Sequence, residues 1–314
     1  MKKKILYFEK LNFQKENIKI IQSKFNVIKF KNLKMQNYPE IISIFLPMDN
    51  YYSGKFFSKF INLRSVVTPT TGDIHLDKNY LKKKKIKIIS LKNFSNSLSK
   101  ITSTSELTLG LIMNMTRQIL FAHNSFIKNR IFNKYNHLFS NNLYTLGIVG
   151  LGRIGHHLAE RAKALGFNVI YFDPFVNNRK FKKIKNFQSF LKKTNILTIH
   201  MHYKKKFYKK FNLQIFQKLK KPSFIINTSR GEFINEDDLI YSFKKKIISG
   251  AGLDVLTNEH TEKFRQNPRT NKLFKFYLKN KKFNLFISPK QGGSNLSAWS
   301  LSEKILIKKL MLYE

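Results

Sequence analysis

The stretch Gly150-Leu151-Gly152-Arg153-Ile154-Gly155 separates a strand-like run at 146–149 from a helix-like run at 157–163. Glycines at this spacing allow a tight turn, let backbone N–H groups approach a phosphate, and let the helix pack closely on the strand. A second strand-like run at 168–172 ends at Asp173, eighteen residues after the last of these glycines. Strand, glycine turn, helix and strand in this order predict a βαβ unit that binds the pyrophosphate of a dinucleotide.

The acidic residue at the end of the second strand selects between dinucleotides. The carboxylate of Asp173 would accept hydrogen bonds from the adenosine ribose hydroxyls and would repel a 2′-phosphate, so the sequence predicts NAD rather than NADP. The alternative is a turn between strand and helix that binds nothing. The residues predicted to contact the cofactor here are Gly150, Gly152, Arg153, Ile154, Gly155 and Asp173.

Length and composition fit two domains of ordinary size, because the chain has 314 residues. No apolar run approaches the roughly 18 residues of a membrane span. The basic start of the chain is followed by a short apolar run at 5–8, which is too brief for a signal peptide. Cysteine is absent, so the chain has no disulfide and no thiol nucleophile. We therefore expect a soluble, cytoplasmic protein.

The charge is strongly positive, since 59 Lys and Arg residues stand against 18 Asp and Glu and give a net charge of +41. One interpretation is attraction to nucleic acid or to an anionic membrane. The other is an A+T-rich coding bias, which would enrich Lys, Asn, Ile, Phe and Tyr together. The lysines are spread along the whole chain. This dispersion favours the second interpretation and predicts weak, non-specific binding of nucleic acid and no membrane partner.

Short β-branched runs alternate with amphipathic stretches in the first hundred residues. They predict strands at 5–8, 26–30, 41–45, 65–68 and 86–90, and helices near 17–24, 51–60 and 78–84. This alternation predicts a parallel-sheet α/β domain. Ser103 and Glu106 then have capping-box spacing ahead of a long helical pattern to residue 129, which we expect to bridge the domains. Strand-like runs after the dinucleotide unit lie at 196–200, 223–227, 249–255 and 285–288.

Four segments, taken in order, resemble the D-isomer-specific 2-hydroxyacid dehydrogenases, the group that includes D-3-phosphoglycerate dehydrogenase. They are Thr70-Thr71-Gly72-Asp73-Ile74-His75-Leu76-Asp77, the glycine turn, Asn227-Thr228-Ser229-Arg230-Gly231, and Gly252-Leu253-Asp254-Val255 with Glu259. The resemblance implies an α/β fold in which a Rossmann NAD-binding domain (103–287) is inserted into a smaller flavodoxin-like substrate domain (1–102 and 288–314). It also implies a homodimer formed through the helical segment at 103–129.

The same resemblance implies an enzyme that transfers hydride between nicotinamide and a small 2-oxo or 2-hydroxy acid. Arg230 would grip the substrate carboxylate, for which a planar and permanently charged guanidinium is suited. The backbone at Thr71 and Gly72 would hold the other end of that carboxylate. Thr228 and Asp254 would lie beside the cofactor. The alternative for Arg230 is a surface arginine without a partner.

The residue that would transfer the proton departs from the family. Where the family has a histidine in a Pro-His-x-Gly-Gly loop, this chain has Pro289-Lys290-Gln291-Gly292-Gly293. Glu259 matches the acidic partner of that histidine, with an exposed glutamate as the alternative. An imidazole exchanges its proton near neutrality, whereas a lysine in water stays charged up to about pH 10. Either Lys290 donates the proton during ketone reduction, or the protein binds NAD without turnover.

The histidines near these segments do not replace the missing one. His75, His200, His202 and His260 are expected to pack in the interior or to face solvent. None has the spacing to carboxylates that a metal site requires, so the sequence predicts no metal.

Overall fold

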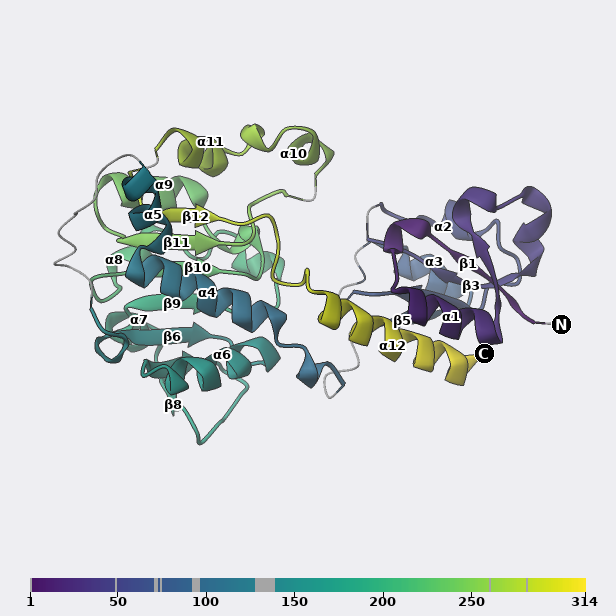
Figure 1. The fold of residues 1–314 in the computed structure, drawn as a ribbon, viewed down its shortest axis with the longest axis horizontal. Coiled ribbons are helices and arrows are strands. Elements are labelled where there is room, and N and C mark those ends of the chain that lie inside the picture. The colour runs from purple at the N-terminus through teal and green to yellow at the C-terminus, as the bar shows by residue number, and fades with distance from the viewer. Residues whose placement is uncertain are drawn as a thin grey trace. The chain divides into compact units, whose positions relative to one another are not determined.

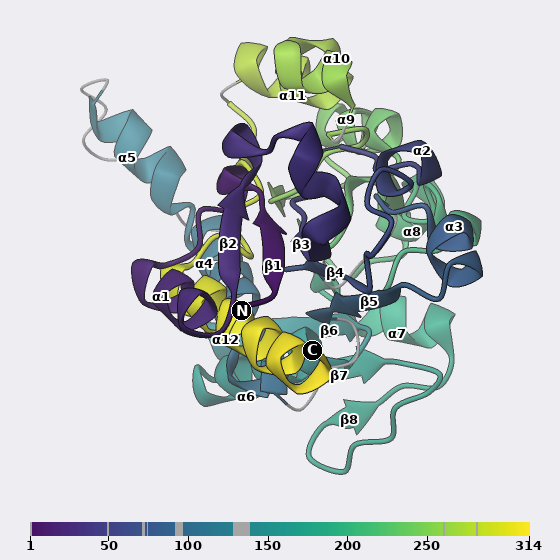
Figure 2. The ribbon, with the colours of Figure 1, turned by 90° about the vertical axis from the view of Figure 1, so that its right-hand side faces the viewer.

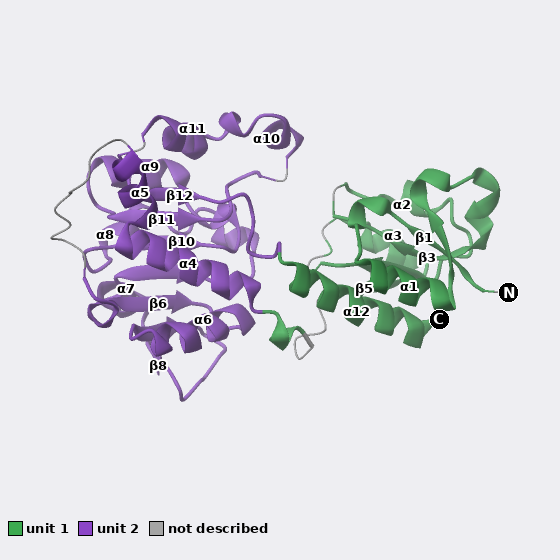
Figure 3. Ribbon diagram, in the orientation of Figure 1, with its two compact units in different colours: residues 1–101, 295–314 green, residues 102–294 purple. Residues whose placement is uncertain are grey.

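The computed structural model of the chain describes residues 2–48, 50–70, 73, 75–91, 97–127, 139–259, 261–280 and 282–314 (Figure 1). The chain divides into two compact units, residues 1–101 with 295–314 (unit 1) and residues 102–294 (unit 2; Figure 3). The sequence placed the second boundary at 287/288, seven residues too early. The boundary lies later because the loop after residue 287 is hydrogen-bonded to Asp254 inside unit 2.

Unit 1 contains a five-stranded parallel sheet in the order β2-β1-β3-β4-β5, which is the flavodoxin-like order (Figure 2). Its strands are β1 (Lys4–Tyr7), β2 (Asn26–Lys29), β3 (Ile41–Phe45), β4 (Ser65–Thr68) and β5 (Lys87–Ser90). The helices that follow strands are α1 (Lys15–Lys24), α2 (Gly54–Phe57) and α3 (Lys78–Lys83). The five predicted strands are confirmed, whereas the helix predicted at 51–60 is a single turn.

The C-terminal helix α12 (Leu296–Tyr313) completes unit 1. Leu306 and Leu310 pack into one of its core clusters. The carboxylate of Glu303, 3% exposed, accepts hydrogen bonds from the Gln14 N–H at 2.9 Å and from Asn17 Nδ2 at 2.5 Å. These bonds fix α12 to the start of α1, so both ends of the chain build one unit and unit 2 is an insertion.

Unit 2 contains a parallel sheet that its described residues form from seven strands, in the order β12-β11-β10-β9-β6-β7-β8. The strands are β6 (Thr145–Val149), β7 (Asn168–Phe172), β8 (Lys182–Lys183), β9 (Ile196–Ile199), β10 (Phe224–Asn227), β11 (Gly250–Leu253) and β12 (Leu285–Ile287). Six of them were predicted. The sequence missed β8 because two lysines carry no hydrophobic alternation.

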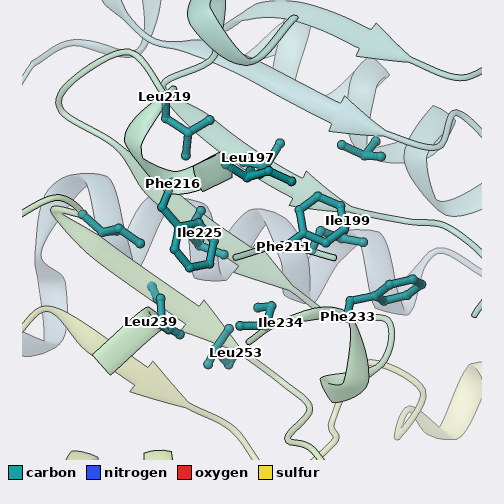
Figure 4. Close-up of a cluster of buried hydrophobic side chains, with 14 of the residues drawn as sticks. Leu197, Ile199, Phe211, Phe216, Leu219, Ile225, Phe233, Ile234, Leu239 and Leu253 are labelled. Carbon is teal, nitrogen blue, oxygen red and sulfur yellow. The ribbon is translucent and has the colours of Figure 1, made fainter. Parts of the chain in front are cut away.

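Alternate residues of these strands enter two different cores, as the two-residue period of a strand requires. In β9, Ile196 packs on the side of α4 (Ser103–Arg117) and α6 (Arg153–Ala164), whereas Leu197 packs on the other side. That other core, partly drawn in Figure 4, is covered by α7 (Phe187–Lys193), α8 (Leu213–Gln217), α9 (Glu236–Lys244) and α11 (Lys272–Lys279). The short helix α10 (Glu262–Gln266) precedes α11. Unit 2 is therefore a three-layer α/β fold.

The long helix predicted from Ser103 to residue 129 is wrong in two respects. It breaks at Gln118, whose φ of 52° is left-handed, into α4 and α5 (Ile119–Ile127). It also does not bridge the domains, because α4 lies entirely in unit 2 and packs Leu111 and Met115 against that unit's sheet. The described helices include none that is long and apolar enough to cross a membrane.

Candidate cofactor and catalytic site

The glycine turn lies where the strand order of unit 2 reverses. The chain leaves β6 toward β7 on one side, whereas β9 pairs with β6 on the other. Such a switch point is where α/β sheets bind ligands, beyond the carboxyl ends of the strands. Gly150 has a φ of +94°, and a Cβ there would lie 2.7 Å from the backbone oxygen of His200 after β9. Only glycine therefore fits where these two strand ends meet.

The next two glycines, Gly152 and Gly155, leave room beside the first turn of α6 and let this helix approach the glycine turn. A Cβ on Gly155 would lie 2.2 Å from the backbone oxygen of Gly150, so this glycine allows the helix to approach the turn. A Cβ on Gly152 would meet nothing within 4 Å among the described residues, and no side chain of that set caps α6. Arg153 and Ile154 form the first turn. Its N–H groups and the positive end of the helix dipole can therefore receive a pyrophosphate.

Asp173 follows β7 and is fixed by backbone donors. Its Oδ2 accepts a hydrogen bond from the Leu151 N–H of the glycine turn at 2.9 Å, and its Oδ1 accepts from the N–H groups of Phe175 and Val176 at 2.8 and 3.1 Å. A carboxylate can accept about four hydrogen bonds, so capacity remains for ribose hydroxyls. The first turn of α6, the glycine cradle and this oriented carboxylate together fit NAD.

The loop after β10 carries Thr228 and Arg230. The Asn227 side chain braces this loop by donating to the Arg230 carbonyl at 2.8 Å and accepting from the Ser229 N–H at 3.0 Å. Thr228 is buried and its hydroxyl lies 2.9 Å from that of Thr108. The half-buried Arg230 donates from Nη1 to the Ser229 carbonyl at 2.8 Å. A guanidinium has five N–H donors, so donors remain for a carboxylate.

The loop after β11 lies directly against the loop after β10. A Cβ on Gly231 would lie 2.0 Å from the backbone of Leu256, so the two loops approach as closely as a glycine permits. Carboxylates fix the second loop, because Glu259 accepts from the Leu256 N–H at 3.1 Å and Glu236 from the Thr257 N–H at 2.8 Å. Burial raises the pKa of Glu236, and the hydrogen bond from Thr257 opposes this. Nothing in the sequence pattern indicated this second acidic brace.

Glu259 and Lys290 meet in the structure. Lys290 Nζ lies 2.7 Å from Glu259 Oε1, and the side chains are 40% and 12% exposed. Lys290 comes from the loop after β12, which pairs with β11. Arg230, Glu259 and Lys290 therefore follow three neighbouring parallel strands at the same edge of one sheet. This ion pair holds the Lys290 ammonium group beside the largely covered Glu259 carboxylate.

Asp254 holds the Lys290 loop in place. Its carboxylate, in a residue that is 2% exposed, accepts from Ser288 Oγ at 2.6 Å and from the N–H groups of Gln291 and Gly292 at 2.7 and 2.8 Å. Its backbone oxygen accepts from the Lys290 N–H at 3.0 Å. Lys290 itself has a φ of 55°, a left-handed conformation that is strained for lysine. The loop keeps this conformation because Asp254 bonds to residues on both sides of it.

Other predicted positions lie elsewhere. Thr71, Gly72 and His260 are outside the described residues. His75 is buried in unit 1, with Nε2 3.0 Å from Thr68 Oγ1. Burial lowers the pKa of His200 to about 3, so it is neutral near pH 7 and cannot act as the missing acid. Within the described ranges, no group of three or more His, Cys, Asp or Glu residues could hold a metal ion.

A sequence model of the D-isomer specific 2-hydroxyacid dehydrogenase NAD binding domain matches residues 109–280, more than half of the chain. The chain therefore belongs to the D-isomer specific 2-hydroxyacid dehydrogenase family, and unit 2 contains that family's NAD binding domain. The predicted family, fold class and NAD cofactor are thereby confirmed.

Relatives with known names include D-3-phosphoglycerate dehydrogenase of Bacillus subtilis, which is 33% identical over 256 residues. That match covers 80% of this chain and 46% of the relative, so the chain spans about half the length of that protein. Glycerate dehydrogenase of Methylorubrum extorquens is 27% identical over 205 residues, covering 63% of this chain and 62% of the relative.

Solved structures share the fold of the whole chain. The NAD-complexed D-isomer specific 2-hydroxyacid dehydrogenase of Lactobacillus delbrueckii ssp. bulgaricus has a TM-score of 0.81 at 18% identity, covering 98% of this chain and 96% of its own. D-lactate dehydrogenase of Aquifex aeolicus, complexed with NAD and lactic acid, has a TM-score of 0.79 at 20% identity and covers 98% and 95%.

Proposed function

We propose that the protein is an NAD-dependent oxidoreductase that interconverts a small 2-oxo acid and the corresponding 2-hydroxy acid. The observation that carries this proposal is the 2.7 Å contact between Lys290 and Glu259, at the sheet edge that also presents Arg230. The cofactor, when bound, supplies or accepts the hydride. Gly150 to Gly155 and Asp173 would hold its pyrophosphate and adenosine ribose, and Thr228 would lie beside it.

Arg230 binds and orients the substrate in this proposal. A 2-oxo acid carries its carboxylate next to the reacting carbonyl, so a bidentate contact to the guanidinium also sets the direction of that carbonyl. The braced loop between Asn227 and Gly231 fixes the backbone of Arg230, and the bond from Nη1 to the Ser229 carbonyl orients its guanidinium before substrate arrives. Preorganisation of this kind lowers the activation barrier, because the guanidinium loses little orientational freedom when the substrate binds.

Lys290 provides the proton. During reduction, its ammonium donates a hydrogen bond to the carbonyl oxygen and then transfers a proton to the developing alkoxide. Glu259 holds the ammonium in position through their 2.7 Å contact. Oxidation requires the reverse transfer to a neutral amine, which a lysine in water forms only around pH 10. Reduction should therefore proceed at neutral pH, and oxidation should require alkaline conditions.

The test is reduction at pH 7 with NADH and a panel of 2-oxo acids that includes pyruvate, hydroxypyruvate and phosphohydroxypyruvate. Lys290→Ala should abolish reduction while NADH affinity changes less than twofold, and Lys290→His should restore oxidation near neutrality. Lys275→Ala, an exposed lysine on α11, is the matched control. Reduction that is indifferent to Lys290→Ala would show that this residue is not the acid.

A second candidate function is binding of NAD without turnover. It is favoured by one observation, that a lysine occupies the position where the family has its histidine. A folded protein that binds NADH and reduces no member of the panel would establish this second function. Phosphohydroxypyruvate, the 2-oxo acid that corresponds to 3-phosphoglycerate, is included in the panel because of the relative from Bacillus subtilis.

We further propose that the protein forms a homodimer through α5. None of the nine residues of this helix is buried, and Ile119, Phe126 and Ile127 are 55%, 61% and 63% exposed. Figure 2 shows α5 extending away from the sheet of unit 2. An apolar helix exposed in this way is typical of a surface that a second copy covers. Sedimentation should give a dimer that Phe126→Asp converts to a monomer.

A further inference from the structure

An open surface cavity of about 720 Å³ lies on unit 2 at the amino ends of β6 and β7, and residues of α6, α7 and β8 contribute to its lining. It is lined by Thr145, Lys163, Phe167, Asn168, Val169, Ile170, Lys180, Phe181, Lys182, Lys192, Lys193 and Lys220. The glycine turn leaves the opposite end of β6, and the four steps from Thr145 to Val149 cover roughly 13 Å. The cavity is therefore separate from the candidate NAD site.

The lining is cationic and contains no carboxylate. Half of its residues are lysines, whereas Lys and Arg together make up 59 of the 314 residues of the chain. Lysine is therefore more concentrated in this lining than in the chain as a whole. One of the six, Lys180, forms an ion pair with Glu160, at 3.7 Å between two largely exposed groups. The other five have no acidic partner within the described parts of the chain.

Helix ends explain only part of this charge. Lys163 lies in the last turn of α6, and Lys192 and Lys193 lie in the last turn of α7. Cations there interact favourably with the negative ends of helix dipoles. Each dipole contributes about half a negative charge, so the two helix ends offset about one of six positive charges. Lys182 and Lys220 belong to neither helix end and only add repulsion.

The size and lining of the cavity indicate the ligand. Its volume is within the range of roughly 300 to 1,000 Å³ that is usual for small-molecule sites. Lysine ammonium groups bind phosphates as point charges, and one phosphate cannot neutralise five unpaired cations. We propose that this cavity binds a small anion that carries a chain of phosphates, either inorganic polyphosphate or the triphosphate of a nucleotide.

The source of the phosphates can be distinguished by titration of the full chain with two probes. Isothermal titration calorimetry at about 150 mM salt, where long-range attraction is screened, should give a dissociation constant below about 100 μM for tripolyphosphate. Equal affinity for ATP would assign recognition to the phosphates alone. Tighter binding of ATP would assign additional contact to the apolar lining around Phe167 and Phe181.

The variant that tests the site is Lys182→Gln/Lys193→Gln/Lys220→Gln, which removes one cation from each of three segments. Tripolyphosphate should bind at least tenfold more weakly to it. NADH affinity should stay within twofold of the unmodified protein, which shows that the variant is folded and that this site is independent of the proposed dehydrogenase activity.

The matched control removes the same charge elsewhere in unit 2, at the exposed residues Lys263, Lys275 and Lys279, each changed to Gln. Its affinity for tripolyphosphate should change less than twofold. An equal loss in both triple variants would refute a specific site, as would the absence of binding at millimolar tripolyphosphate. Binding of a single-stranded oligonucleotide that depends on the cavity lysines, but that tripolyphosphate does not displace, would instead indicate a nucleic-acid surface.

Discussion

Asp254→Asn should release the loop that carries Lys290. The carboxylate accepts three hydrogen bonds from Ser288 Oγ and from the N–H groups of Gln291 and Gly292, at 2.6 to 2.8 Å. An asparagine keeps one carbonyl oxygen and turns its NH₂ group toward at least one of these donors. An unsatisfied buried donor costs about 1–3 kcal/mol, and each remaining bond loses about 1 kcal/mol of charge assistance. The sum is about 3–5 kcal/mol, and its lower end already corresponds to roughly a hundredfold in the opening equilibrium of the loop.

Hydrogen exchange measures this opening directly. The amides of Gln291 and Gly292 should exchange about a hundredfold faster in Asp254→Asn, whereas amides of the α6 core should be unchanged. The kcat for reduction of a 2-oxo acid should fall, whereas NADH affinity should change less, because the displaced group is Lys290. Asp237→Asn, an exposed acid on α9, controls for the loss of charge. Exchange of both amides within threefold of the unmodified protein would refute the assignment of Asp254 as the residue that holds this loop.

Three further outcomes are expected. NADH should bind at least tenfold more tightly than NADPH, and Asp173→Ala should reduce this difference in affinity. Equal affinities of the unmodified protein for the two cofactors in a fluorescence titration would contradict this prediction. Nucleic acid should bind weakly and without sequence preference, and should be released at moderate salt in a filter-binding assay, because dispersed lysines neutralise phosphates without contacting bases. Burial raises the pKa of Glu236 above its ordinary value of 4.5, so the folded state holds this proton more tightly. The resulting stability is present at low pH and lost as the pH rises through the raised pKa, and Glu236→Gln should remove this pH dependence from urea unfolding.

Strand positions were predictable because the periodic signal for each strand is local. The five strands of unit 1 and six in unit 2 follow from short β-branched runs between polar segments. The break between α4 and α5 was not predictable in the same way. Gln118 adopts a left-handed conformation within a pattern whose apolar spacing continues past it, and the Asn114 side chain accepts from the Leu120 N–H at 3.0 Å. Such a hydrogen bond from a side chain to the backbone does not change the spacing of apolar residues, so the helix break cannot be predicted from that spacing.

The site was predictable as a set of residue types at strand ends. Gly150, Asp173, Arg230 and Glu259 each follow a predicted strand, and parallel strands bring their carboxyl ends to one edge. The sequence alone therefore predicted the sheet edge at which these residues meet, and also that Lys290 stands where the family has a histidine. These properties depend on order and spacing along the chain.

Only the tertiary structure decided how those residues are held. The sequence suggested a place beside the cofactor for Asp254, whereas the fold directs its carboxylate to Ser288 and to the loop of Lys290. The 2.7 Å pairing of Lys290 with Glu259 and the lysine-lined cavity likewise join segments that lie far apart in the chain. Hydrogen bonds and Coulomb interactions act over a few ångströms in space, so their partners are set when the strands pair and the loops pack together.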